Sequence, residues 1–253
     1  MPRCSACAVS RGGAGASPLM RAGCVMDQRL LVVSPHFDDA VLSCGGLLAA
    51  TPGAMVLTVF SGVPSVAAAL PDWDRRCGFE RADQAMQARQ AEDRDALTQL
   101  GASGLGLGLL DSQYPGSEAM LARLPSVLAA AVQSVRPGAL LIPLGLFHED
   151  HVRVADAALA VRGLFDGCDW LAYEEALYRR KRGAVQARLT QLHGRNVYAT
   201  PVALPGDARD ASKTRAVAAY RSQLQALGVV PGQGDDAAPE RYWRLSWPGA
   251  ALP

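Results

Sequence analysis

Short apolar runs alternate with helical segments from residue 29 to residue 163, and this alternation constrains the fold more than any other feature of the sequence. The run Arg29-Leu-Leu-Val-Val-Ser34 is typical of a buried strand that ends at a loop, and a helical segment follows from Asp38 or Asp39 to about Ala50. Parallel neighbouring strands need a helical crossover between them. The pattern therefore predicts an α/β fold, with a Rossmann-like parallel sheet sandwiched between helices.

The rest of the chain continues this pattern. We expect further strands at 54–60, 105–110, 139–143, 171–178 and 197–204, and helices at 82–100, 119–135, 151–163 and 211–227. Residues 230–239 are expected to form a surface loop, because too little chain follows them for another domain. Residues 26–253 are predicted to form a single domain, and residues 1–25, which lack apolar periodicity, a disordered extension.

Charge and composition limit the partners. The formal net charge is +1, so the chain lacks the basic field that holds a phosphate backbone, and we expect no nucleic-acid partner. No run approaches the roughly 18 apolar residues that span a bilayer, so stable membrane insertion is not expected. The six cysteines are scattered, with Cys4 and Cys7 as the one close pair, which favours a reducing compartment and hence the cytoplasm.

Polar clusters follow two of the predicted strands at their carboxyl ends, where open α/β sheets bind ligands. Pro35-His36-Phe37-Asp38-Asp39 comes directly after the first strand, and His148-Glu149-Asp150-His151 comes shortly after the strand at 139–143. The two clusters contain three of the four histidines in the chain. The fourth, His193, has no partner at a useful spacing and is expected to lie on the surface.

Imidazole and carboxylate groups together are the ligand set of a catalytic zinc ion, which keeps three protein ligands and a position for water. We expect His36, Asp39 and His151 to bind zinc. Asp38 is then free to act as general base toward the zinc-bound water, and His148 to act as an acid or at the oxyanion. Each residue alone has a more ordinary explanation, since an aspartate before a helix is usually an N-cap. The combination favours a metal site.

These clusters carry a resemblance to a known family. Pro35-His-Phe-Asp-Asp39, with the following Cys44-Gly-Gly46, resembles the signature of the PIG-L or LmbE-like zinc-dependent N-deacetylases. The second cluster, from His148 to His151, resembles the His-x-Asp-His element of that family. Further matches lie at Arg89-Gln-Ala-Glu92 and between Lys213 and Gln223, so the resemblance covers most of residues 29–225.

The resemblance implies a role for each matched residue. His36, Asp39 and His151 would hold one Zn²⁺ per chain, with other divalent metals able to substitute for it. Asp38 would be the general base, His148 would assist at the oxyanion or the leaving amine, and Asp150 would orient a histidine. Two departures are visible: Ala40 stands where the family usually has a carboxylate, and no tyrosine lies just before His148.

The resemblance also implies a substrate, the acetamide or another N-acyl amide of an N-acetylglucosamine-type sugar or glycoconjugate. Arg89 is carried over as a substrate-binding residue, with a surface ion pair to Glu92 as the alternative. Aromatic side chains that could stack on a sugar ring, with core or rim packing as the alternative, are Tyr114, Tyr173, Tyr178, Trp73 and Trp243. The competing function is a non-catalytic metal- or nucleotide-binding Rossmann-like module. The expected partner is a small molecule, and a homo-oligomer is left open.

Overall fold

The computed structural model describes residues 29–165 and 167–248. The predicted extension at 1–25, which includes Cys4 and Cys7, lies outside these residues. Among the described residues, the free cysteines are Cys44, Cys77 and Cys168. In the same residues, none of the helices combines the length and the apolar character needed to cross a bilayer.

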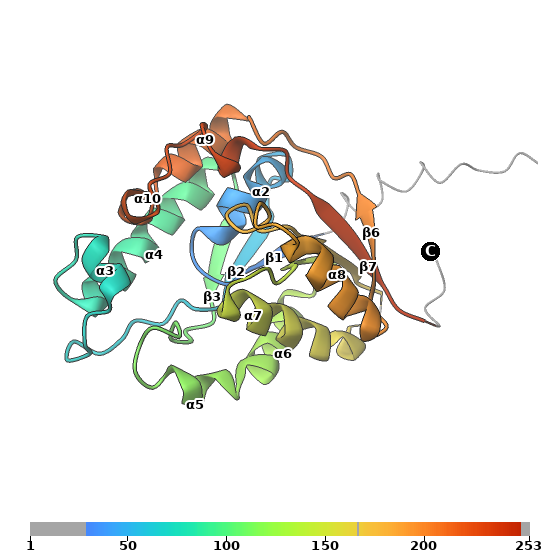
Figure 1. Cartoon of the computed structure of the whole chain (residues 1–253), viewed down its shortest axis with the longest axis horizontal. Helices are drawn as coiled ribbons and strands as arrows, with labels where there is room; N and C mark the ends of the chain where they lie inside the picture. Colours follow the sequence, from blue (N-terminus) through green and yellow to red (C-terminus); the bar gives the residue numbers. More distant parts are fainter. Residues whose placement is uncertain (1–28, 166, 249–253) are drawn as a thin grey trace, which may run out of the picture.

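A seven-stranded sheet forms the centre of the molecule, in the order β3-β2-β1-β4-β5-β7-β6 (Figure 1). The strands are β1 (Leu30–Ser34), β2 (Met55–Thr58), β3 (Ser103–Gly106), β4 (Ala139–Pro143), β5 (Asp169–Tyr173), β6 (Tyr198–Val202) and β7 (Tyr242–Ser246). The helices are α2 (Asp39–Ala49), α3 (Asp72–Arg76), α4 (Ala82–Gln99), α5 (Ser117–Leu121), α6 (Leu124–Val135), α7 (Glu149–Ala160), α8 (Ala184–Gly194), α9 (Ala211–Ala218) and α10 (Arg221–Leu227), with 3-10 turns η2 (Arg162–Leu164) and η3 (Asp235–Ala237).

The predicted α/β class is confirmed, but the sheet is mixed. Strands β3, β2, β1, β4 and β5 pair in parallel, with Val32 of β1 opposite Val56 on one side and Leu141 on the other. Strand β7 runs antiparallel to both of its neighbours, β5 and β6. The sequence analysis predicted a parallel sheet and did not predict β7. This strand has only five residues and follows a Pro, Gly and Asp-rich connection, so its apolar pattern was too short to be recognised.

Helices cover both faces of the sheet, and alternate residues of each buried strand point to opposite faces. Leu30 and Val32 of β1 pack in one apolar cluster with residues of α2, α4, α9 and α10. Leu31 and Val33 pack in the other cluster, with residues of α6, α7 and α8 (Figure 1). The two layers bury β1 on both sides and fix its carboxyl end in the middle of the molecule.

Several predicted boundaries move in the structure. The helix predicted at 119–135 is two helices, α5 and α6, and Pro125 in the first turn of α6 explains the new start. The helix predicted at 211–227 is likewise divided into α9 and α10. The strand predicted at 105–110 is β3 at Ser103–Gly106, and the strand predicted at 171–178 ends at Tyr173. Helices α3 and α8 were not predicted.

Candidate active site

The chain leaves β1 through a tight turn that is held by its own polar side chains. The hydroxyl of Ser34 donates to the carbonyl of His36 at 2.5 Å and accepts from the amide of Ala40 at 3.0 Å. The carboxylate of Asp39 accepts from the amide of His36 at 2.9 Å. These bonds replace ladder bonds at the end of the strand, start helix α2, and bring the His36 and Asp39 side chains to the same side of the turn.

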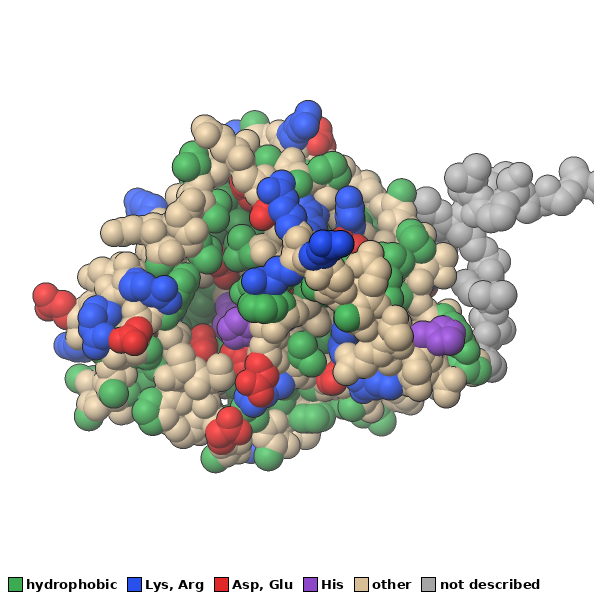
Figure 2. All heavy atoms as spheres, in the orientation of Figure 1, with side chains coloured by type: hydrophobic (Ala, Val, Ile, Leu, Met, Phe, Trp, Pro, Cys, Tyr) green, Lys and Arg blue, Asp and Glu red, His purple; other side chains and the backbone are tan. Residues whose placement is uncertain are grey.

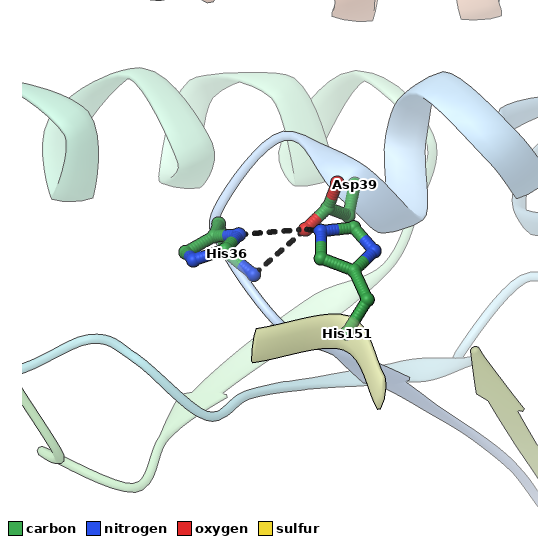
Figure 3. Close-up of side chains that lie close together, drawn as sticks. All are labelled: His36, Asp39 and His151. Atoms are coloured by element: carbon green, nitrogen blue, oxygen red, sulfur yellow. Dashed lines mark hydrogen bonds and ion pairs between the residues drawn. The ribbon is translucent and has the colours of Figure 1, made fainter. Parts of the chain in front are cut away.

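The structure brings together the three predicted metal ligands, although they come from segments more than 100 residues apart (Figure 3). Oδ2 of Asp39 lies 3.2 Å from Nδ1 of His36 and 3.2 Å from Nε2 of His151. One ligand atom from each residue lies within 4.8 Å of the others. His151 reaches this point from the first turn of α7, because β4 and β1 are parallel neighbours and their carboxyl ends meet.

Asp38 occupies the N-cap position of α2, but its side chain makes no capping hydrogen bond. The ordinary explanation for an aspartate before a helix therefore does not apply to it. The side chain is buried beside Asp39, and burial together with the charge of Asp39 raises the pKa of Asp38 to about 6. The site thus holds a carboxylate whose oxygens are not committed to the helix and which exchanges a proton near neutral pH.

His148 is the N-cap of α7 and so precedes the helix, in agreement with the prediction that the helix begins after His148. The helix itself begins at Glu149, two residues before the predicted start at His151. Its Nδ1 accepts from the amide of Asp150 at 3.2 Å. The imidazole still faces the other two, with ring centroids 5.4 Å from His36 and 5.3 Å from His151. Burial and the two neighbouring histidines lower the pKa of His148, which favours the neutral ring, with its proton on Nε2.

Asp150 is fully buried beneath His36. Its Oδ2 lies 3.3 Å from Nε2 of His36 and accepts from the hydroxyl of Ser112 at 2.8 Å. Asp111 approaches the same imidazole nitrogen at 3.6 Å. Asp150 is therefore in contact with a histidine, and the orienting role expected of it stays a prediction. The sequence analysis did not select Asp111 or Ser112, although both directly follow the strand predicted at 105–110 and the carboxyl-end rule applies to them.

Neighbouring carboxylates raise the pKa of two imidazoles of the cluster, those of His151 and His36. Burial alone would lower the pKa of His151, but Asp39 and Glu175 raise it to about 9. Burial likewise opposes the charged form of His36, and Asp150, Asp39 and Asp111 raise its pKa well above the usual value. A cluster with this surplus of negative charge stabilises a cation, either protons on the rings or a metal ion between them.

His36, Asp38, Asp39 and His148 line a cavity of about 440 Å³, a size within the range of about 300–1,000 Å³ typical of small-molecule sites. His151 and Asp150 are fully buried and do not line it. Figure 2 shows histidine and acidic side chains inside a hollow whose margins carry hydrophobic and basic side chains. Of the aromatic residues considered for stacking, Trp73 and Tyr178 line this cavity. Tyr114 and Tyr173 are instead fully buried core residues.

Arg89 also lines the cavity, but its guanidinium group is already engaged. Nη2 donates to Oδ1 of Asp74 at 2.6 Å, and the hydroxyl of Tyr114 donates to the other oxygen of Asp74 at 2.7 Å. The surface ion pair with Glu92, the alternative for Arg89, is not formed, because both residues are buried and Glu92 accepts from Ser222 instead. His193 is exposed, as expected.

Comparison with known proteins identifies relatives of the chain. Residues 31–162 match the family model PIG-L, described as GlcNAc-PI de-N-acetylase. A 2'-N-acetylparomamine deacetylase of Streptomyces fradiae is 31% identical over 185 residues, which span 67% of this chain and 64% of the relative. The chain therefore matches less than two thirds of the length of that protein.

Two solved structures share the fold. A triple mutant of a deacetylase in the teicoplanin biosynthetic pathway superposes with a TM-score of 0.71 at 25% identity, covering 88% of this chain and all of the other. The A40926 pseudoaglycone deacetylase Dbv21 has a TM-score of 0.68 at 23% identity and covers 87% of this chain and 97% of its own. Since the family model matches just over half of the 253 residues, the resemblance read from the sequence is confirmed, and the chain belongs to the PIG-L family.

Proposed function

We propose that this protein is a zinc-dependent N-deacetylase that hydrolyses the acetamide of an N-acetylglucosamine-type sugar or glycoconjugate. One observation carries the proposal: ligand atoms of His36, Asp39 and His151 lie within 4.8 Å of one another, and His36, Asp39 and the uncommitted carboxylate of Asp38 line a cavity. The names of the relatives, a 2'-N-acetylparomamine deacetylase and a deacetylase of the teicoplanin biosynthetic pathway, support the same reaction class.

The donor set fits a catalytic zinc ion. Two imidazoles and one carboxylate are the nitrogen and oxygen ligands that zinc accepts, and three protein ligands leave a position open. Nε2 of His151 is buried and makes no hydrogen bond with any described residue, which suits a nitrogen whose lone pair is reserved for a metal. Zinc bound by these residues would act as a Lewis acid, polarising the amide carbonyl and acidifying the attacking water.

Asp38 is assigned the proton transfers. Its carboxylate lines the cavity next to Asp39, and the raised pKa, about 6, lies close to neutral pH, where a general base is most effective. We assign it the removal of a proton from water as that water attacks the acetamide. The same carboxyl group can then return the proton to the departing amine, because a base that has accepted a proton becomes an acid.

His148 and Asp150 are assigned supporting roles. The Nδ1 atom of His148 is occupied by the amide of Asp150, so its Nε2–H is the donor available to the developing oxyanion. Asp150 holds His36 through Nε2, which leaves Nδ1 of His36 facing Asp39. Arg89 is assigned a contact with the sugar, since it lines the same cavity. The free cysteines of the described residues support a cytoplasmic location for the reaction.

The test is a panel of N-acetylated amino sugars and their glycosides incubated with zinc-loaded protein, with free amine and acetate measured together. Equimolar release of amine and acetate is expected from at least one N-acetylglucosamine derivative, and release at least about a hundredfold slower from the Asp38→Asn variant. Stoichiometric zinc binding without any release would refute the proposal and favour the non-catalytic metal-binding module.

A further inference from the structure

Phe147 has a backbone conformation that L side chains rarely adopt. Its φ is 59°, and its side chain is 65% exposed. Among the described non-glycine residues, Arg136 and Asn196 also have positive φ, but they lie in turns at the ends of helices. A bulky residue in the left-handed region is strained, and glycine is favoured there. Since the exposed ring gains little from burial, the fold does not account for phenylalanine at this position, and strain of this kind points to function.

The ring of Phe147 belongs to a row of aromatic rings that leads out of the active-site cavity. Its centroid lies 5.7 Å from that of Tyr178, and the Tyr178 ring is stacked 6.1 Å from His148. Tyr178 and His148 both line the cavity. Nζ of Lys181 lies 3.6 Å from the centroid of the Phe147 ring and anchors it by a cation–π contact. Phe147 is thus the outer, exposed end of a surface that begins at the reacting groups.

The chemistry changes along this row. The lining of the cavity contains histidines and carboxylates, and it also contains Tyr178. Phe147 lies outside this lining and extends the aromatic surface of Tyr178, and Figure 2 shows hydrophobic and basic side chains around the hollow. A substrate with its acetamide beside the histidines and carboxylates would direct its non-reacting part along this aromatic surface. A contact between two aromatic rings contributes more binding free energy than burial of the same apolar area alone.

We propose that Phe147 and Tyr178 form an aromatic ledge that binds an aryl aglycone attached to the amino sugar. The inference rests on the deacetylase function proposed above and specifies the class of its substrate. It requires that the side chain of Phe147 contacts the ligand and does not mainly stabilise helix α7 by packing against it. Phe147 precedes the N-cap of that helix, a position from which an apolar residue can pack against the first turns, but a side chain that is 65% exposed has little such packing to lose.

The experiment compares two substrates, N-acetylglucosamine and its phenyl β-glycoside, with zinc-loaded wild type and with Phe147→Gly. In the wild type, kcat/KM for the phenyl glycoside is expected to exceed that for the free sugar by about three- to tenfold, the worth of one aromatic contact. Phe147→Gly is expected to abolish this ratio and to leave kcat/KM for the free sugar nearly unchanged. Its Tm should be equal to that of the wild type or higher, because glycine relieves the strain at φ 59°.

The matched control is Leu164→Ala, which removes an apolar side chain of similar exposure, 69%, from the turn η2. The control is expected to keep the wild-type ratio. An unchanged ratio in Phe147→Gly, or equal kcat/KM for both sugars in the wild type, would overturn the ledge, and a marked fall in the Tm of Phe147→Gly would assign Phe147 to helix packing instead.

Failure of the proposed function has a different signature, namely hydrolysis of neither sugar by the zinc-loaded wild type. Calorimetric titration then tests the ledge without turnover. Tighter binding of the phenyl glycoside than of the free sugar, lost in Phe147→Gly, would support the ledge. Equal binding of the two sugars by the wild type would overturn it.

Discussion

Oε1 of Glu175 lies 3.4 Å from Nδ1 of His151, and both side chains are fully buried. The same oxygen accepts from the amides of Gly145 at 2.8 Å and Leu146 at 2.9 Å. One carboxylate therefore holds both the loop that leads to α7 and the ring of His151. A hydrogen bond at Nδ1 places the ring proton there and directs the lone pair of Nε2 toward Asp39.

Glu175→Gln is expected to weaken zinc binding by about 10- to 100-fold, the usual cost of losing a carboxylate behind a metal-binding histidine. Glutamine keeps an oxygen for the amides of Gly145 and Leu146, so Tm should change little. Zinc affinity is measured by competition with a chelating dye. The control is Glu174→Gln, since Glu174 is also buried but accepts from the indole of Trp243 at 3.1 Å. Equal zinc affinity in both variants and the wild type would contradict a positioning role for Glu175.

Asp38→Asn and Asp39→Asn are expected to fail in different ways. Asp39 lies between two imidazoles, so its amide variant should lose zinc affinity, and excess zinc should restore part of the activity. Asp38 makes no capping bond, so its amide variant should keep stoichiometric zinc and lose at least about a hundredfold in kcat, the low end for loss of a general base. Zinc content by elemental analysis is measured beside kcat. A fully active Asp38→Asn variant would exclude the proposed proton transfer.

The site was predictable where polar residues directly follow an apolar strand. His36, Asp38 and Asp39 follow β1, and the carboxyl-end rule was sufficient to select them. Glu175 obeys the same rule, since β5 ends at Tyr173, but the predicted strand ran to residue 178 and so placed this carboxylate inside the sheet. A strand boundary wrong by a few residues therefore concealed the group that holds His151.

The ion pair of Arg89 could not be predicted from the sequence, for a different reason. Its partner Asp74 lies on α3, a helix of five residues that is too short to show a helical period. The ion pair depends on tertiary packing of α3 against α4, which no local pattern encodes. The apolar runs, by contrast, predicted the parallel strands β1, β2, β4 and β5, because strands buried on both faces appear in the sequence as continuous apolar segments. The edge strand β3 is exposed and lacks such a run, and its predicted bounds were displaced.

Arg89→Leu is expected to lower the free energy of unfolding by about 3–5 kcal/mol, because it leaves the Asp74 carboxylate buried without its cation. The pair is almost fully buried, with side-chain exposures of 5% and 0%. The double variant Arg89→Leu with Asp74→Asn removes both charges and should recover much of that loss in urea denaturation. If Arg89 also contacts the sugar, KM should remain raised in the stable double variant. A wild-type KM there would leave Arg89 a structural role alone.

The pH dependence of stability should change in Asp93→Asn. Asp93, on α4, is buried and accepts from the hydroxyl of Tyr220 at 2.7 Å. Burial raises its pKa to about 7, and the charge of Asp38 adds to the effect, whereas the Tyr220 hydrogen bond opposes it. The folded state therefore binds a proton that the unfolded chain, with an ordinary carboxyl pKa near 4, has released. Between these two values the wild type loses stability as pH rises, by at most about 1.4 kcal/mol per pH unit from this group.

Asparagine does not titrate and still offers an oxygen to the Tyr220 hydroxyl, so the stability advantage of Asp93→Asn over the wild type should grow from about pH 4 to pH 7 and then level off. The free energy of unfolding, from urea titrations at several pH values, measures that difference directly. The matched control is Asp95→Asn, which removes an exposed carboxylate from the same helix. A pH-independent difference between Asp93→Asn and the wild type would mean that Asp93 stays ionised in the folded protein. The buried carboxylate would then need a cationic partner, and the charge it adds beside Asp38 would have to be included in the electrostatics of the site.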